Sequence, residues 1–291
     1  MQVEWPPHLV ERIAANQWVL FVGSGIAATC ANSAKARPPA WEALLRQLCA
    51  LIRDLDLRKV GDVLIDQQQL LSAAEHIRYV LADENKLNTY VATLRRAVEG
   101  PSGDAFQPSP LYDVLLSLDP RVVFTTNYDK LFEIASRHGF ATHSFNSRGL
   151  GSDLRRGTPV LVKLHGSTDS IDEIILTRTD YVRVMNDGRQ TLEILRALAL
   201  TSTILFVGYS LDDPDIQLVL QSTGRRSLDP EAHFMLAPRP ATPSRIPLFR
   251  DTYGVTVLPY PPGDHASVEE SLRALSSEVL ALRAALAGSA P

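Results

Sequence analysis

The stretch that decides the fold is Trp18-Val19-Leu20-Phe21-Val22-Gly23-Ser24-Gly25-Ile26-Ala27-Ala28. Its first five residues are all apolar, which is typical of a strand that is covered on both faces. The remainder reads G-x-G-x-x-A, a strand-to-helix turn of small residues that lets the backbone approach a pyrophosphate. A plain tight turn has the same composition, so by itself the motif predicts only a buried strand followed by a close turn.

Five more short apolar runs follow, and they also lack alternation with polar residues. They are Val122 to Thr125, Pro159 to Leu164, Thr203 to Val207, His233 to Leu236 and Val255 to Leu258. Most precede a polar or glycine-containing turn and then a helix-like segment, such as Asp129 to Arg137 or Pro214 to Gln221. This rhythm predicts an α/β fold, a Rossmann-like, mostly parallel six-stranded sheet with helices on both faces. The loops after its strands meet at the carboxyl edge, where such sheets bind ligands.

Helical patterns fill the interval of about residues 40–115 between the first two strands. Helices are expected over Trp41 to Arg53, Asp62 to Leu81 and Lys86 to Val98. Because this interval is too long for a simple crossover, we expect a helical insertion within a single domain that spans residues 1–291. A smaller insertion is expected over Asp180 to Leu200. A last helix, at about residues 266–286, carries one apolar stripe and is expected to pack on its own domain, with a partner chain as the alternative.

The composition excludes several classes of protein. Apolar residues make up 45% and charged residues 21%, as in globular chains, and the formal net charge is −4. No overall basic field exists, so we predict no direct binding of nucleic acid. The chain has neither a signal-peptide pattern at its start nor an apolar run of membrane-spanning length, which predicts a soluble, cytoplasmic protein. Its two cysteines, Cys30 and Cys49, are too few for a four-thiolate zinc site, so no metal site is expected.

Polar turns follow the second and third predicted strands. The first of them, Thr125-Thr126-Asn127-Tyr128-Asp129, carries groups that can hold ribose hydroxyls or a carboxamide. Asn127 is the better functional candidate, because Asp129 can equally cap the helix that follows. The second, Lys163-Leu164-His165-Gly166-Ser167, places an imidazole at the carboxyl edge, where it can act as a general base. A lone His-Gly pair is more often structural, so this residue needs support from its neighbours.

The fourth turn is Gly208-Tyr209-Ser210-Leu211-Asp212-Asp213-Pro214-Asp215, a strand end that leads into a helix with proline in its first turn. Either Asp212 or Asp213 can serve only as a helix cap. An ordinary dehydrogenase is disfavoured, because the acidic residue expected about 20 positions after the glycine turn is missing from a second strand end. Glu42 falls instead in a helical pattern.

Taken in order, the four turns resemble the sirtuin family, specifically its bacterial NAD-hydrolysing branch in antiphage defence. The resemblance runs from about Trp18 to Tyr260. It implies that His165 is the catalytic base, with Asn127 and Asp129 beside the nicotinamide ribose. The residues that it implies for binding the dinucleotide are Gly23, Ser24, Gly25 and Ile26 around the phosphates, Thr126, and Gly208 and Ser210 at the adenosine half.

Sirtuin deacylases ordinarily carry two C-x-x-C pairs that bind zinc beside the acyl-lysine groove, and this chain has none. The resemblance therefore implies an NAD+ hydrolase that releases nicotinamide and ADP-ribose, with NAD+ as substrate and no zinc. A protein deacylase of the same fold and a non-catalytic module that senses NAD or ADP-ribose are the alternatives. Relatives of similar length act with a separately encoded protein, which implies a homo-oligomer with a partner such as a HerA-like ATPase or helicase, or less often a short Argonaute.

Overall fold

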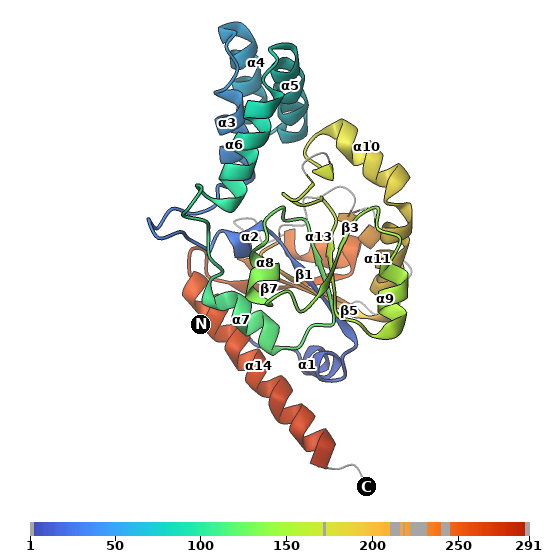
Figure 1. Ribbon diagram of the computed structural model, residues 1–291. Coiled ribbons are helices and arrows are strands. Elements are labelled where there is room, and N and C mark those ends of the chain that lie inside the picture. The colour runs from blue at the N-terminus through green and yellow to red at the C-terminus, as the bar shows by residue number, and fades with distance from the viewer. Residues whose placement is uncertain are drawn as a thin grey trace.

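The computed structural model describes residues 3–170, 173–209, 216–217, 219–221, 232–239 and 245–288. This part of the chain contains a seven-stranded parallel sheet in the order β3-β4-β2-β1-β5-β6-β7 (Figure 1). The strands are β1 (Trp18–Val22), β2 (Val122–Thr125), β3 (Ala141–Ser144), β4 (Val160–Lys163), β5 (Thr203–Val207), β6 (His233–Pro238) and β7 (Val255–Tyr260). The predicted α/β class and parallel sheet are confirmed. The predicted count of six strands is wrong, because β3 is an additional edge strand that pairs with β4.

The order of the strands places the candidate site. From β1 the chain first forms one side of the sheet, where β2, β4 and β3 lie in that spatial order, and then crosses to the other side of β1, where β5, β6 and β7 lie. The direction of winding therefore reverses at β1, and such a reversal is where open α/β sheets form their ligand crevice. Val22 pairs in register with both Thr125 and Val207, and Thr125 pairs with Lys163. The four turns thus leave adjacent strands at nearly the same level of one edge.

Helices cover both faces of the sheet (Figure 1). One face packs against α1 (Pro7–Ala14), α2 (Ser24–Ala27), α7 (Pro110–Ser117), α8 (Leu131–Ala135) and α14 (His265–Gly288). The other face packs against α9 (Leu150–Arg156), α11 (Arg189–Thr201) and α13 (Arg245–Tyr253). Alternate residues of β1 supply the two hydrophobic clusters, with Leu20 in the first and Phe21 in the second. This double burial is why the strand is apolar throughout.

The helical insertion is a bundle of four helices with its own hydrophobic core. Its members are α3 (Trp41–Cys49), α4 (Leu55–Asp66), α5 (Leu70–Asp83) and α6 (Leu87–Glu99). The single helix predicted over Asp62 to Leu81 is wrong, because the chain breaks at Gln68, whose φ is 58°. The bundle projects from the sheet and lies beside α10 (Arg178–Asp187) in Figure 1. Helix α7, also within the expected interval, belongs to the layer on the sheet.

The C-terminal helix α14 packs on its own chain, as predicted. Its stripe of Val268, Leu272, Leu275 and Val279 is buried, and the helix lies against α1 and α7. Leu286, at the end of the stripe, is exposed. Arg283 donates hydrogen bonds to carbonyl groups at the C-terminal ends of α1 and α7, a position that favours a cation. Among the helices in the described ranges, none has both the length and the apolar character needed to cross a membrane.

Candidate active site at the carboxyl edge

The turns after β1 and β5 are in direct backbone contact. The amide of Gly23 donates to the carbonyl of Val207 at 3.0 Å, and the amide of Gly25 donates to the carbonyl of Gly208 at 2.8 Å. A Cβ on Gly25 would lie 2.9 Å from the Gly208 Cα, and a Cβ on Gly208 would lie 2.6 Å from the Ile26 nitrogen. Gly208 also has a φ of +66°, which favours glycine. The glycines therefore close the two central turns on each other at the point where the winding reverses.

The backbone contacts between the turns after β1 and β5 limit which groups of the turn after β1 can face a ligand. Helix α2 has only four residues, and the Ile26 amide is used by the Gly23 carbonyl at 3.1 Å. The Gly25 amide is also occupied, by Gly208. Ser24 is exposed at the start of the helix. Four residues were predicted to bind at this turn: Gly23, Ser24, Gly25 and Ile26. Of these four, Ser24 is the one that exposes a side chain to solvent.

Asn127 ties the turn after β2 to the turn after β1. The Thr125 hydroxyl donates to the carbonyl of Val22 at 2.8 Å and accepts from the Asn127 backbone amide at 3.0 Å. The Asn127 side-chain nitrogen then donates to the carbonyl of Gly23 at 3.2 Å. Asn127 is buried and Thr126 beside it is half-buried. The carboxamide is therefore held in one orientation at the edge between β1 and β2.

His165 follows β4 and lies in an aromatic setting. Its ring centroid is 5.3 Å from that of Tyr181, edge to face, and 6.5 Å from that of Tyr128. The segment around Ile175 returns over it, since the Ile175 amide donates to the His165 carbonyl at 3.0 Å. Gly166 is required for this return, because its φ is +80° and a Cβ there would lie 2.4 Å from the Glu173 carbonyl oxygen. His165 itself is buried, at 7% exposure, so the loop and the two tyrosines hold its imidazole in place.

Asp129 precedes α8 and bonds to its first residue, although the N-cap position of that helix, the structural alternative for Asp129, belongs to Lys130. The Asp129 Oδ1 accepts a hydrogen bond from the Leu131 amide at 2.9 Å, at the start of α8. Burial raises the pKa of the Asp129 carboxyl to about 6, although the nearby Lys163 ammonium and the Leu131 amide oppose that shift. Asp129 therefore has a structural function at α8. A role at the ribose remains a prediction.

Lys163 is a site residue that the sequence reasoning did not single out. Its side chain is 2% exposed, and its ammonium pairs with the Glu133 carboxylate at 2.8 Å. The same ammonium donates to the backbone carbonyls of Asp129 and, at 3.4 Å, of Tyr128. It thereby fastens the end of β4 to the loop that carries Asn127. A lysine that ends an otherwise apolar strand, two residues before the histidine, was the available signal.

The remaining predictions concern residues outside this cluster. Ser210 and the rest of its turn, through Asp215, lie outside the described residues. In the part of the chain that the structure describes, no group of three or more His, Cys, Asp or Glu side chains is placed to hold a metal ion. Cys30 and Cys49 are free buried thiols in separate hydrophobic clusters.

Part of this chain matches a known protein family. Residues 121–258 match the family model of the SIR2-like domain. This segment therefore resembles a SIR2-like domain. The match contains β2 to β6 and most of β7, with Asn127, His165 and Gly208, whereas the turn at Gly23 precedes it.

Two curated relatives match parts of this chain. An NAD(+) hydrolase ThsA of Acinetobacter baumannii is 27% identical over 214 residues, which are 73% of this chain and 40% of the relative. Defense-associated sirtuin 2 of Bacillus subtilis is 28% identical over 134 residues, 43% of this chain and 13% of that protein. The chain thus spans well under half the length of these relatives. A crystal structure of a Sir2 homologue in complex with NAD aligns with 97% of this chain and 96% of that chain, at 13% identity and a TM-score of 0.49.

Proposed function

We propose that this protein hydrolyses NAD+ at the bond between nicotinamide and ribose, giving nicotinamide and ADP-ribose, as an NAD-depleting effector of antiphage defence. The names of the relatives, an NAD(+) hydrolase and a defence-associated sirtuin, support this assignment. The observation that carries it is the joining of three adjacent turns. Asn127 bonds to Gly23, Gly25 bonds to Gly208, and His165 follows the neighbouring strand β4.

The chemistry needs few groups. Nicotinamide leaves from a cationic ring nitrogen, so the electron pair of the broken C–N bond neutralises the leaving group without an added proton. The site must stabilise an oxocarbenium-like ribose and direct one water molecule to it. In our proposal the His165 imidazole accepts a proton from that water as the new C–O bond forms, an effect worth about 10²- to 10⁴-fold.

The other predicted residues hold the substrate. Asn127, oriented by Gly23, directs the water or the carboxamide of nicotinamide. We assign the Asp129 Oδ2 atom to the ribose or to its developing positive charge, since Oδ1 is engaged by Leu131. Ser24 meets the phosphates, with Gly23, Gly25 and Ile26 forming the turn around it. Thr126, Gly208 and Ser210 complete the dinucleotide site toward the adenosine half.

Product analysis tests the proposal. The purified protein is incubated with NAD+, alone and with an acyl-lysine peptide, and the products are identified by mass. We expect nicotinamide and ADP-ribose in equal amounts without the peptide. Deacylation of the peptide, with an acyl-ADP-ribose product, would replace the hydrolase with a deacylase. Tight binding of NAD+ without any consumption over hours, with candidate partner proteins present as well as absent, would instead indicate a sensor module.

The control of such an enzyme is a further part of the proposal. Unrestrained hydrolysis of NAD+ would deplete the cell that makes the protein, so activity must depend on assembly or a trigger. We propose a homo-oligomer with a separately encoded partner, such as a HerA-like ATPase or helicase, or less often a short Argonaute. Light scattering together with NAD+ turnover tests this. A monomer at micromolar concentration that works at full rate alone would exclude it.

A further inference from the structure

One face of helix α5 holds the first turn of α10 with polar contacts. The residues on α5 are spaced by three, and each contacts one of three consecutive residues of the other helix. The contacts are Ser72 with Arg178 at 3.2 Å, Glu75 with Thr179 at 2.8 and 3.0 Å, and Arg78 with Asp180 at 2.8 and 2.9 Å. The insertion is thus attached to the element that carries Tyr181, the aromatic neighbour of His165.

Asp180 is the central residue of this attachment. Its side chain is 6% exposed, and its Oδ2 accepts hydrogen bonds from the Thr177 amide at 2.9 Å, the Thr177 hydroxyl at 2.7 Å and the Leu176 amide at 3.2 Å. Burial raises the pKa of the Asp180 carboxyl, but the bonds from Arg78 and Thr177 outweigh it and hold the pKa below its usual range. One ionised carboxylate therefore binds the insertion and the 174–177 segment together.

The same segment contacts the catalytic candidate on its other side. The Ile175 amide donates to the His165 carbonyl at 3.0 Å, and the Ile175 carbonyl accepts from the Tyr128 hydroxyl at 2.7 Å. Asp180 also precedes Tyr181, whose ring edge lies against the His165 ring. Two short routes thus connect Asp180 to His165, one through the backbone of residues 175–177 and one through the neighbouring tyrosine.

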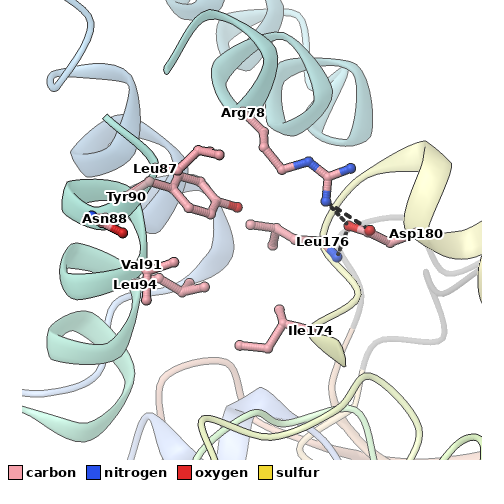
Figure 2. A pocket seen from close by; sticks show the side chains of 9 residues that line it. All are labelled: Arg78, Leu87, Asn88, Tyr90, Val91, Leu94, Ile174, Leu176 and Asp180. Atoms are coloured by element: carbon pink, nitrogen blue, oxygen red, sulfur yellow. Dashed lines mark hydrogen bonds and ion pairs between the residues drawn. The ribbon is translucent and has the colours of Figure 1, made fainter. Parts of the chain in front are cut away.

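The 174–177 segment also packs against the insertion, because Ile174 and Leu176 are buried in the same hydrophobic cluster as residues of its helices. A cavity of about 400 Å³ lies between α5, α6 and the 174–180 segment. Figure 2 shows Tyr90 and Leu176 facing into it. The ion pair of Arg78 and Asp180 crosses from the insertion to the segment at the side of this cavity. The charged pair therefore adds a directed polar contact to this apolar packing, at the side of the cavity.

From these contacts we propose that Arg78 and Asp180 are positioning residues for His165, so that the helical insertion sets the orientation of the base. The inference rests on the proposed function in taking His165 as that base. Arg78 does not touch the site and acts through Asp180. A displacement of about 1 Å at a reacting group can cost 10²-fold in rate, so a link of this kind acts on turnover rather than on binding.

The test compares Arg78→Gln and Arg78→Lys with a matched control, Arg46→Gln. Arg46 lies in the same insertion and also pairs with carboxylates, Glu42 and Asp66, both at 2.8 Å, but these lie on α3 and α4. The imidazole signal of His165 is followed by NMR with labelled histidine and assigned from the spectrum of His165→Gln. Steady-state turnover of NAD+ is measured in parallel.

We expect Arg78→Gln to shift the His165 signal and to lower kcat about 10- to 100-fold while KM changes by less than about threefold. Arg78→Lys should restore part of both effects, and Arg46→Gln should change neither. A folded Arg78→Gln protein with an unchanged His165 signal would overturn the inference. If Arg78→Gln fails to fold, the comparison of Arg78→Lys with wild type decides in the same way. Absence of NAD+ turnover in the wild type, with candidate partner proteins present as well as absent, would refute the proposed function, while the NMR comparison would still decide the positioning role.

Discussion

A Cβ atom on Gly23 would lie 2.3 Å from the carbonyl oxygen of Gly208. The two residues are 185 positions apart in the chain, yet their turns close on each other at the carboxyl edge of β1 and β5. The turn after β1 therefore needs glycine for its close contact with the turn after β5, in addition to any access that it gives to a phosphate. It joins the two halves of the sheet where the candidate site lies.

Substitution of Gly23 by alanine is therefore expected to destabilise the fold. Backbone atoms of Gly208 and Tyr209 occupy the space that the new methyl group needs, and a backbone cannot move aside as a flexible side chain can. We predict a loss of about 1–3 kcal/mol in the free energy of unfolding, measured with urea. Gly151→Ala is the control, since its Cβ would meet its nearest atom at 3.6 Å within α9. Equal stability of Gly23→Ala and Gly151→Ala would refute the close contact.

Lys163 gives a prediction about a buried charge. Lys163→Met leaves the buried Glu133 carboxylate without its partner, so it should destabilise the protein by about 3–5 kcal/mol. Glu133→Gln in addition should recover part of this loss, because the unpaired charge is then removed. Urea unfolding of the wild type, both single variants and the double variant provides the cycle. Additive effects of the two substitutions would show that the pair does not interact.

Asp129 gives a prediction about pH. Its pKa is raised from 3.8 to about 6 in the folded protein, so the native state holds a proton more tightly than the unfolded chain. The resulting stabilisation is full below about pH 4 and is lost as the pH rises through about 6.

Asp129→Asn keeps an oxygen that can accept from the Leu131 amide but has no charge. Its stability relative to wild type should rise between about pH 4 and pH 6 and then level off, with a gain of at most about 3 kcal/mol. Chemical unfolding at pH 4.5, 6 and 7.5 measures this. A stability difference that is constant with pH would contradict the raised pKa.

The buried parts of the fold were predictable from sequence, because burial on both faces demands continuous apolar runs. Strand β1 shows this most clearly, with five buried residues in a row. Strand β3 was missed because Ala141–Ser144, at the edge of the sheet, contains threonine, histidine and serine, and only some of its side chains are buried. The break between α4 and α5 was missed because it occurs at Gln68, which adopts a positive φ although it is not a glycine. The sequence therefore contains no glycine there that would predict a turn.

The site shows a similar division. The turns of Gly23, Asn127, His165 and Gly208 follow strands that the sequence places at one edge, and the structure confirms that these strands are adjacent. The ion pair of Arg78 and Asp180 could not be predicted from the sequence, because the two residues are 102 positions apart and lie in two separate helices. Local spacing cannot show which helix of an insertion will lie against which loop of the core.

The most direct measurement is the turnover of NAD+ by His165→Ala beside His138→Asn and the wild type. His138 lies in an exposed turn with a φ of 56°, a conformation that asparagine tolerates. Nicotinamide and ADP-ribose are quantified by mass, in the presence of the partner protein if turnover requires it. The proposed mechanism predicts that His138→Asn works at the wild-type rate and that His165→Ala is slower by about 10²- to 10⁴-fold while remaining folded. A folded His165→Ala protein that releases nicotinamide at the wild-type rate would contradict it.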